Sequence, residues 1–378
     1  IRKYSCIHCK LMIMTTSKYN LSLTLYILVC LCIFTKCKEE INIQVTDANK
    51  PEDTSAYPYK QKLSDYDMFL SPLASMQPKE SVIAYDLNSS LFTDYAFKKR
   101  YIYLPPESSM EYHPTDAFDF PNGSLIFKYF YFPSNFASPE KSYIIIETRV
   151  LIKENDTWSA LTYIWNDEQT DAYLSLAGDY KQVDWTDEAG KKHSLKYAIP
   201  GILQCKSCHE FNSQIEPIGP SARHMNKTYT FNNETVNQLV YLQSRGKIRK
   251  LPAIDSIPSI ADWSNHSYSL DERSRAYLDI NCAHCHRKEG PAKNSGLYLT
   301  AEEQNQSVIG IQKSPVAAGR GSGGLKYDIV PRDPDASIVI HRMRSSEPGV
   351  MMPELGRRTT HTEGIELVSE WIRTMEKL

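Results

Sequence analysis

The chain of 378 residues lacks both a run of apolar residues long enough to cross a membrane and an excess of one charge. The apolar run LSLTLYILVCLCIF, at 21–34, has 14 residues, which is too short for a membrane span but suits a signal-peptide core. The formal net charge is only −2, so no attraction of the whole chain to nucleic acid is predicted. With 41% hydrophobic and 23% charged residues, the chain is expected to be globular.

Cysteine is scarce after residue 37. The four cysteines of this part all belong to two short motifs. Exported proteins usually use cysteine for disulfides that are spread through the fold, and no cysteine is left here for that purpose. The other five of the nine cysteines are Cys6, Cys9, Cys30, Cys32 and Cys37.

The residues after the apolar run predict export. Cys37 lies where a bacterial lipoprotein signal would be cleaved and its cysteine acylated, although Lys36 is unusual before such a cysteine. Lipid anchoring to a membrane through Cys37, simple cleavage and an uncleaved anchor therefore stay open. We expect a signal segment at 1–37, a polar tether at 38–60, and a location in the bacterial periplasm or on a membrane.

The two cysteine motifs share one arrangement. QCKSCHE at 204–210 and NCAHCHRK at 281–288 each contain Cys, two residues, Cys and His. Such a cysteine pair can form thioethers with the vinyl groups of a haem, and the histidine can bind its iron. By chance this pentapeptide is expected on the order of 0.01 times in the chain. The sequence therefore predicts two covalently bound haem c groups. The residues that would hold them are Cys205, Cys208, His209, Cys282, Cys285 and His286.

Zinc binding and redox chemistry are the other interpretations of paired cysteines. A zinc site would need a second cysteine or histidine pair within about 20 residues of the first, whereas more than 70 residues separate the two motifs. A thioredoxin-like dithiol would need a strand-helix-strand context and would occur once. Haem attachment accounts for both copies and for the histidine after each pair.

Two predicted helices frame the second motif. Ser269 and Glu272 form a capping box before the residues that lead into the motif. After Thr362, the segment 364–378 carries its apolar residues on one helical face. The first and last helices of class I cytochromes c pack together, so residues 269–378 are expected to form such a domain.

A methionine loop lies between these two helices. Met352 precedes Pro353 within the segment SSEPGVMMPELGR, at 345–357. A thioether ligand raises the reduction potential of a haem because it favours the ferrous state. In class I cytochromes c, which this part of the chain resembles, the methionine ligand stands just before a proline. The resemblance therefore implies Met352 as the sixth iron ligand of the second haem, with Met351 and then Met343 as alternatives.

The sixth ligand of the first haem stays open. The expected segment of the first haem is 199–268, which is short for a cytochrome fold. It contains one predicted helix, in NETVNQLVYLQSRGKI. This helix is expected to be capped at Asn232 or Asn233 and to end at Gly246. The first haem could also be five-coordinate. The candidate ligands are His224, Met225, His193, His266 and His113.

The region 61–198 is rich in predicted strands. Runs such as SLIFKYFYFP and KSYIIIETRVLI are separated by clusters of Pro, Gly, Asn and Asp, which favours an all-β, sandwich-like domain. KENDTW (Lys153 to Trp158) and FPNGSL (Phe120 to Leu125) are candidate hairpins. The expected fold class is α+β, with an all-β domain followed by a mainly α-helical cytochrome c-like haem region.

Several longer stretches carry a resemblance to a known family. In the haem half these are ADWSN (261–265), SLDERSRAYLDINCAHCH (269–286) and PGVMMPELGRR (348–358), and in the β half YDLNSSLFTDYAFKKR (85–100) and YIWNDEQTDAYL (163–174). They resemble a family of bacterial dihaem c-type cytochromes that have an N-terminal β domain and a C-terminal class I-like domain. The similarity covers roughly residues 62–378. It implies two covalent haems, a periplasmic or membrane-anchored location and electron transfer, but no substrate.

Three functions compete at this point. The first is electron transfer between a dehydrogenase and an acceptor, both of them redox partner proteins. The second is a dihaem peroxidase-like enzyme, in which one haem is open to peroxide. The third is a β domain that binds a ligand, with accessory haems. The coordination of the first haem separates the first two functions, because an enzyme needs an open iron.

Overall fold

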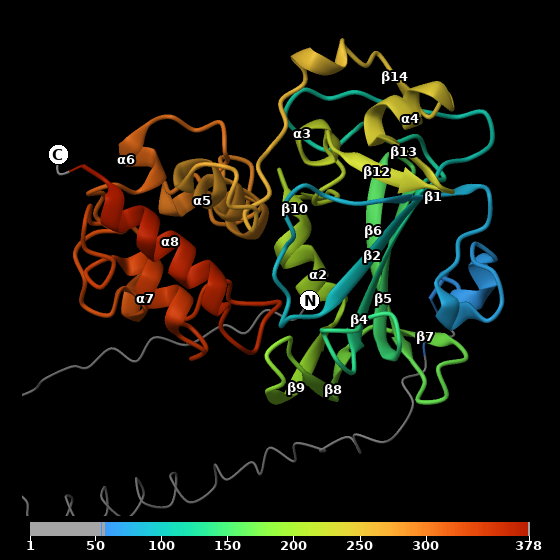
Figure 1. Ribbon diagram of the computed structural model, residues 1–378, viewed down its shortest axis with the longest axis horizontal. Coiled ribbons are helices and arrows are strands. Elements are labelled where there is room, and N and C mark those ends of the chain that lie inside the picture. Colours follow the sequence, from blue (N-terminus) through green and yellow to red (C-terminus); the bar gives the residue numbers. More distant parts are fainter. Residues whose placement is uncertain (1–53, 55–56, 377–378) are drawn as a thin grey trace, which may run out of the picture. The chain divides into compact units, whose positions relative to one another are not determined.

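The centre of the computed structural model is a six-stranded antiparallel sheet with the strand order β1-β2-β4-β5-β6-β7 (Figure 1). The structure describes residues 54 and 57–376, which belong to one compact unit, Glu52–Leu378. The predicted signal segment, Cys37 and most of the tether lie outside the described residues. The strands are β1 (Val82–Tyr85), β2 (Phe97–Tyr103), β4 (Leu125–Pro133), β5 (Tyr143–Glu154), β6 (Thr157–Trp165) and β7 (Ala172–Ser175).

Both faces of this sheet are buried, because successive residues of a strand point to opposite faces. In β4, Leu125 and Phe127 pack in a cluster with Leu63 and Tyr66 of the 3₁₀ turn η1 (Leu63–Tyr66). Ile126, between them, packs in a different cluster. That second cluster also contains residues of α2 (Ile202–His209), α3 (Ala222–Met225) and α4 (Gln238–Ser244). Helices α2, α3 and α4 therefore cover one face of the sheet.

The hairpin prediction for KENDTW is confirmed. Strands β5 and β6 are joined by Asn155 and Asp156, whose φ angles are 49° and 59°. Asn and Asp tolerate this left-handed conformation, which two-residue hairpin turns need at both positions. The hairpin prediction for FPNGSL is wrong. The segment before this turn does not pair with β4, which follows the turn; its Asp119 forms a bridge with Glu111 instead.

Shorter strands complete the β structure. A hairpin of β8 (Gly178–Thr186) and β9 (Lys192–Pro200) packs on one end of the main sheet, where Trp185 and Tyr197 join a cluster with Phe132. Helix α2 begins two residues after β9. The remaining strands are β3 (Met110–Glu111), β10 (Glu210–Phe211), β11 (Gln214–Ile215), β12 (Thr228–Phe231), β13 (Glu234–Asn237) and β14 (Ile248–Arg249).

The C-terminal part is built around two packed helices, α5 (Leu270–Leu278) and α8 (Thr362–Thr374). Their packing confirms the prediction that the first and last helices of this part meet. Trp371 of α8 donates a 2.8 Å hydrogen bond from Nε1 to Asp271 of α5. Helices α6 (Gln306–Ile309) and α7 (Ile338–Arg344) complete this part. No helix in the described residues is both long enough and apolar enough to span a membrane.

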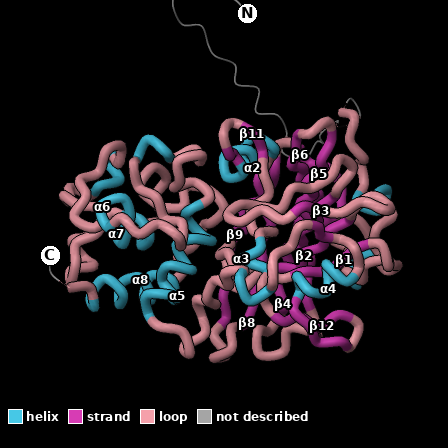
Figure 2. The backbone as a smooth tube through the Cα atoms, turned by 90° about the horizontal axis from the view of Figure 1, so that it is seen from above, coloured by secondary structure: helices cyan, strands magenta, loops and turns pink. Residues whose placement is uncertain are grey.

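The predicted fold class is wrong in both halves. Six of the strands expected to form a sandwich join one sheet, and β8 and β9 form a separate two-stranded sheet. Alternation shows that a strand has two faces but not which strands pair. The haem region is not mainly α-helical: in the described residues, helices α2 to α8 have between four and 13 residues, and loops and short strands lie between them (Figure 2). Prolines interrupt helix formation there; three of them are Pro315, Pro331 and Pro334.

Candidate cofactor site

A single large cavity brings the two cysteine motifs together. Its volume is about 980 Å³, which is near the upper end of the roughly 300 to 1,000 Å³ typical of small-molecule sites. Its walls come from the main sheet, from α2 and from the C-terminal part. All seven predicted site residues line it: Cys205, Cys208, His209, Cys282, Cys285, His286 and Met352.

Helix α2 presents the first motif. The helix begins where the backbone N–H of Gly201 donates to the Gln204 side chain at 3.0 Å. Cys205 and Cys208, three residues apart, then lie on one face of the helix. Cys205 is buried, and its Sγ is 3.7 Å from the hydroxyl oxygen of Thr162 on β6. The first motif is therefore held directly against the main sheet.

His209 has the tautomer that suits a metal ligand. Its Nδ1 lies 2.7 Å from the backbone oxygen of Glu216. A carbonyl oxygen can only accept, so Nδ1 carries the proton and Nε2 keeps its lone pair. Burial lowers the pKa of His209 to about 3, so the ring is neutral at neutral pH. An imidazole oriented by a carbonyl in this way is the usual arrangement of a metal-binding histidine.

The second motif follows α5, whose capping box is confirmed. The hydroxyl of Ser269 accepts from the N–H of Glu272 at 3.2 Å, and the Glu272 carboxylate accepts from the N–H of Ser269 at 2.8 Å. The chain then widens into one π-helical turn, Asp279–Ala283, which contains Cys282. The N–H of His286 donates to the carbonyl oxygen of Cys282 at 2.9 Å. A helical turn therefore carries the second motif as well.

His286 has the same tautomer as His209. Its Nδ1 is 3.3 Å from the hydroxyl oxygen of Ser295, and that hydroxyl donates its own proton to the carbonyl oxygen of Ala292 at 2.7 Å. Ser295 can therefore only accept from His286, which leaves Nε2 unprotonated. Burial lowers the pKa of His286 to about 4. Both motif histidines thus offer a neutral Nε2.

The four cysteines are free thiols with raised pKa values. Burial raises the pKa of Cys282 and of Cys285 to about 12, and it also raises the pKa of Cys205 and Cys208. A reactive dithiol depends on a stabilised thiolate, so this environment disfavours that interpretation. Within residues 54 and 57–376, no three His, Cys, Asp or Glu side chains gather as a metal site. A haem iron needs no such cluster, because the porphyrin supplies four of its ligands.

The methionine loop forms another wall of the cavity. Met352, Met351 and Met343 all line the cavity, so the geometry does not separate the three predicted ligands. Arg357, which is only 5% exposed, holds the loop by donating from Nη2 to the carbonyl oxygen of Met352 at 2.8 Å and to that of Ser345 at 2.8 Å. The loop is therefore fixed by backbone contacts.

Asp94 ties this loop to the β part of the chain. The carboxylate of Asp94, which lies between β1 and β2, accepts from the N–H groups of Arg358 and Thr359 at 2.7 Å and 2.9 Å. Burial raises the pKa of Asp94, although these two hydrogen bonds oppose the rise. This contact joins residues more than 260 positions apart in the sequence.

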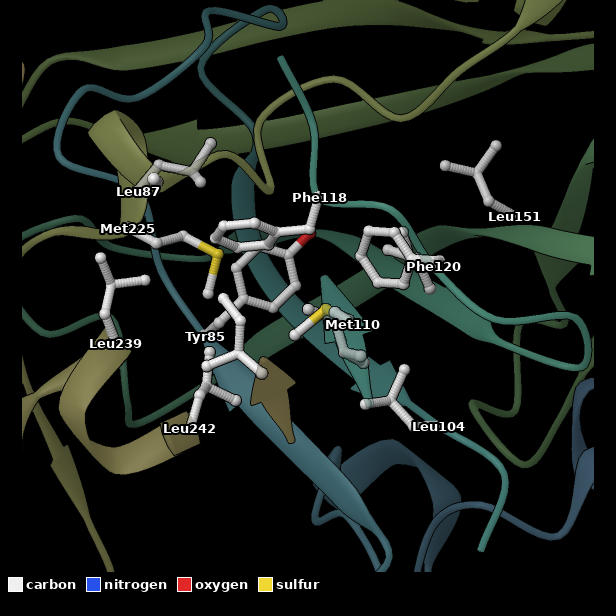
Figure 3. Packing of buried hydrophobic residues seen from close by; sticks show 14 of the residues in the cluster. Tyr85, Leu87, Leu104, Met110, Phe118, Phe120, Leu151, Met225, Leu239 and Leu242 are labelled. Carbon is white, nitrogen blue, oxygen red and sulfur yellow. The ribbon is translucent and has the colours of Figure 1, made fainter. Parts of the chain in front are cut away.

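The predicted alternatives for the sixth ligand of the first haem lie elsewhere. His224 is 3% exposed, and its Nε2 is 2.8 Å from the Asp279 carboxylate. Met225 points into the apolar core, with its sulfur beside Phe118 and Tyr85 (Figure 3). Neither side chain is among the described residues that line the large cavity. His113, His193 and His266 do not line the large cavity either.

Two other histidines line the cavity and were not predicted. Nδ1 of His284 is shielded from solvent and has no hydrogen-bond partner among the described residues; burial lowers the pKa of His284 to about 4. His361 receives or donates a 3.0 Å hydrogen bond with Tyr277 and stacks on Phe92 at 4.2 Å. His284 could have been noticed, because it lies inside the second motif. His361 has no such signal in the sequence.

In comparisons with known proteins, no family model, no curated protein and no solved structure matches the chain. The cavity, the neutral Nε2 atoms and the paired thiols fit haem c. Any assignment of function therefore depends on these residues themselves.

Proposed function

We propose that the chain is a dihaem c-type cytochrome of the bacterial family that it resembles. Cys205 and Cys208 would hold one haem by thioethers and Cys282 and Cys285 the other, with His209 and His286 as the proximal ligands. The observation that carries this proposal is that two Cys-x-x-Cys-His motifs line one cavity, each with its histidine Nε2 free.

Electron transfer is the proposed activity. A bound haem supplies an iron that cycles between the ferric and ferrous states. The protein would hold both porphyrins in one largely apolar cavity, and Met352 would bind the second iron. His284, with its unpartnered Nδ1 in the same cavity, is our candidate for the sixth ligand of the first iron. Both irons would then be six-coordinate, which leaves no open position for a substrate and suits a relay between redox partner proteins.

Export and anchoring belong to the same proposal. Haem c is a cofactor of exported bacterial proteins, and the apolar run before Cys37 is consistent with export. A lipid on Cys37 would hold the protein at a membrane. The partners would be a periplasmic dehydrogenase and an electron acceptor.

The first test is the mass of the intact protein after expression with haem maturation machinery. We expect a gain of two haems in the wild type. Cys205→Ser/Cys208→Ser and Cys282→Ser/Cys285→Ser should each carry one haem, because each motif acts independently. A gain of one haem or none in the wild type would contradict the proposal.

A peroxidase-like enzyme is the second candidate. A smaller cavity of about 70 Å³ is lined by His209, His224, Asp279 and His284. The hydrogen bond between His224 and Asp279 resembles the oriented base that peroxide chemistry needs. Carbon monoxide separates the two functions, because it binds ferrous haem at an open position. Rapid binding at the first haem would favour the enzyme, and no binding at either haem would favour electron transfer.

A further inference from the structure

A row of three cations crosses the sheet on the face that lines the large cavity. Arg100 of β2 lies directly opposite Lys128 of β4, and Lys128 lies directly opposite Arg149 of β5. All three residues line the cavity. The three side chains are neighbours because of the register between β2, β4 and β5, and not because they are close in the sequence.

Such a row costs free energy unless an anion compensates it. Side chains directly opposite each other in antiparallel strands have Cβ atoms about 5 Å apart, and like charges at this spacing destabilise a sheet. Burial also lowers the pKa of Lys128 well below its ordinary value, and the charges of Arg100 and Arg149 lower it further. The surrounding wall is apolar, including Ile126 and Leu151.

The carboxylates of the described chain compensate this row only in part. Arg149 makes a bidentate pair with Glu147 at 2.6 Å and 2.9 Å. Nη1 of Arg100 pairs with Asp86 at 3.1 Å, but Nη2 is buried and has no partner. Lys128 has no ion pair or hydrogen bond with any described residue; its nearest partner is the ring of Phe130, 4.9 Å away. The row therefore has an unpartnered guanidinium N–H group and an unpartnered lysine side chain facing a cavity.

The position of the first motif indicates what anion belongs there. Thr162 of β6 lies opposite Arg149 and continues the row by one strand, and its hydroxyl is 3.7 Å from Cys205 Sγ. Strands lie about 4.8 Å apart, so Lys128 is roughly 10 Å and Arg100 roughly 14 Å from the thioether anchor along this row. The propionates of a haem leave the porphyrin at the edge opposite the thioethers.

We propose that Arg100, Lys128 and Arg149 form the binding site for the propionate carboxylates of the haem attached to Cys205 and Cys208. This inference rests on the proposed function, because it requires that haem. The row neutralises the two propionates inside the cavity and so stabilises the ferrous state of the first haem. It also fixes the rotation of that haem about its thioethers.

The test compares Lys128→Met with Lys99→Met in the full-length holoprotein. Lys99 is on β2 beside Arg100 but points to the other face of the sheet, opposite Tyr129. Spectroelectrochemical titration gives the midpoint potentials of both haems, and the methionine-to-iron band identifies the second one. At a fixed potential, Lys128→Met should shift the ferrous-to-ferric ratio of the first haem roughly tenfold toward ferric, because the loss of a positive charge beside the propionates favours ferric iron. Lys99→Met should leave both haems unchanged.

The outcomes separate the two proposals. A holoprotein without haem at Cys205 and Cys208 refutes the proposed function. If both variants carry two haems and the midpoint potential of the first haem is the same in both, the propionate site is overturned. Succinate, added as a free dicarboxylate, should not change the spectrum of the wild type, because the propionates occupy the row. A succinate response in the wild type that is lost in Lys128→Met would mean that the row binds external carboxylates, and it would also overturn the inference.

Discussion

Burial sets the protonation states of the residues around the cavity. It lowers the pKa of His209 to about 3 and that of His286 to about 4, so both rings are neutral when they would bind iron. Their orientation comes from one backbone carbonyl and one serine hydroxyl. The motifs in the sequence predict which residues could bind haem. They do not contain these partners, which lie seven and nine residues further along the chain.

The ligand of the second haem can be tested by substitution in the methionine loop. Met352→Ala should abolish the methionine-to-iron charge-transfer band and lower the potential of that haem, because a thioether favours ferrous iron. Met351→Ala is the matched control, since Met351 also lines the cavity. Absorption spectra of the oxidised proteins decide the matter: a band that persists in Met352→Ala but disappears in Met351→Ala would identify Met351 as the ligand.

The ligand of the first haem can be tested through His284. His284→Ala should open the first iron, so the ferrous variant should bind one carbon monoxide rapidly while the wild type binds none. His193→Ala is a suitable control, because His193 pairs with Asp187 on the β8–β9 hairpin and does not line the cavity. Stopped-flow absorbance measures the binding. Equal carbon monoxide binding by the wild type and His284→Ala would exclude His284.

Local signals in the sequence predicted some elements well and others poorly. The capping box of α5 and the two-residue turn between β5 and β6 depend on near neighbours, and both were predicted. The helix expected after Asn232 or Asn233 begins only at Gln238, because Glu234–Asn237 pairs with β12. The N-cap of this helix is Asn237. Gly246, where the helix was predicted to end, has a left-handed φ of 64°, which is typical of a glycine after a helix. Pairing with another strand outweighs helix propensity there.

The capping box gives a stability prediction for α5. Ser269→Ala removes the hydroxyl that accepts from the N–H of Glu272, and the loss of such a cap costs about 1 kcal/mol of unfolding free energy. Ser267→Ala is the control, because Ser267 is exposed and its hydroxyl has no hydrogen bond with the described residues. Chemical denaturation of the holoprotein measures both variants. Equal stabilities of the two would show that the box contributes nothing.

At the scale of the whole molecule, the cavity depends on contacts between distant segments. Arg100, Lys128 and Arg149 become neighbours only through strand register, and Asp94 reaches the methionine loop across most of the chain. Periodicity in the sequence contains neither the strand order nor such contacts, so one shared cavity could not be predicted from two separate motifs. The expected division into a sandwich and a helical domain failed for the same reason.

Asp279 joins helix α3 to the C-terminal part through hydrogen bonds to both. Its carboxylate accepts from His224 at 2.8 Å, from Arg223 at 3.2 Å and from the N–H of Ala301 at 2.8 Å. Burial alone would raise the pKa of Asp279, but the hydrogen bond from His224 and the charge of Arg223 outweigh it, so the pKa is lowered. A lowered pKa in the folded state stabilises the protein above the pKa of the unfolded chain, about 4. This stabilisation is lost as the pH falls.

Asp279→Asn should therefore destabilise the holoprotein by roughly 1 to 3 kcal/mol at pH 7, because it removes the buried carboxylate that accepts from His224 and one of the two carboxylates that pair with Arg223, the other being Glu302. Below about pH 4, the unfolding free energy of the variant should also fall less steeply with pH than that of the wild type. Asp255→Asn, at an exposed position, should stay within about 0.5 kcal/mol of the wild type. Denaturant unfolding between pH 3 and pH 7 measures all three proteins. Parallel pH profiles for the wild type and Asp279→Asn would contradict the role of Asp279 as the ionised link between the two segments.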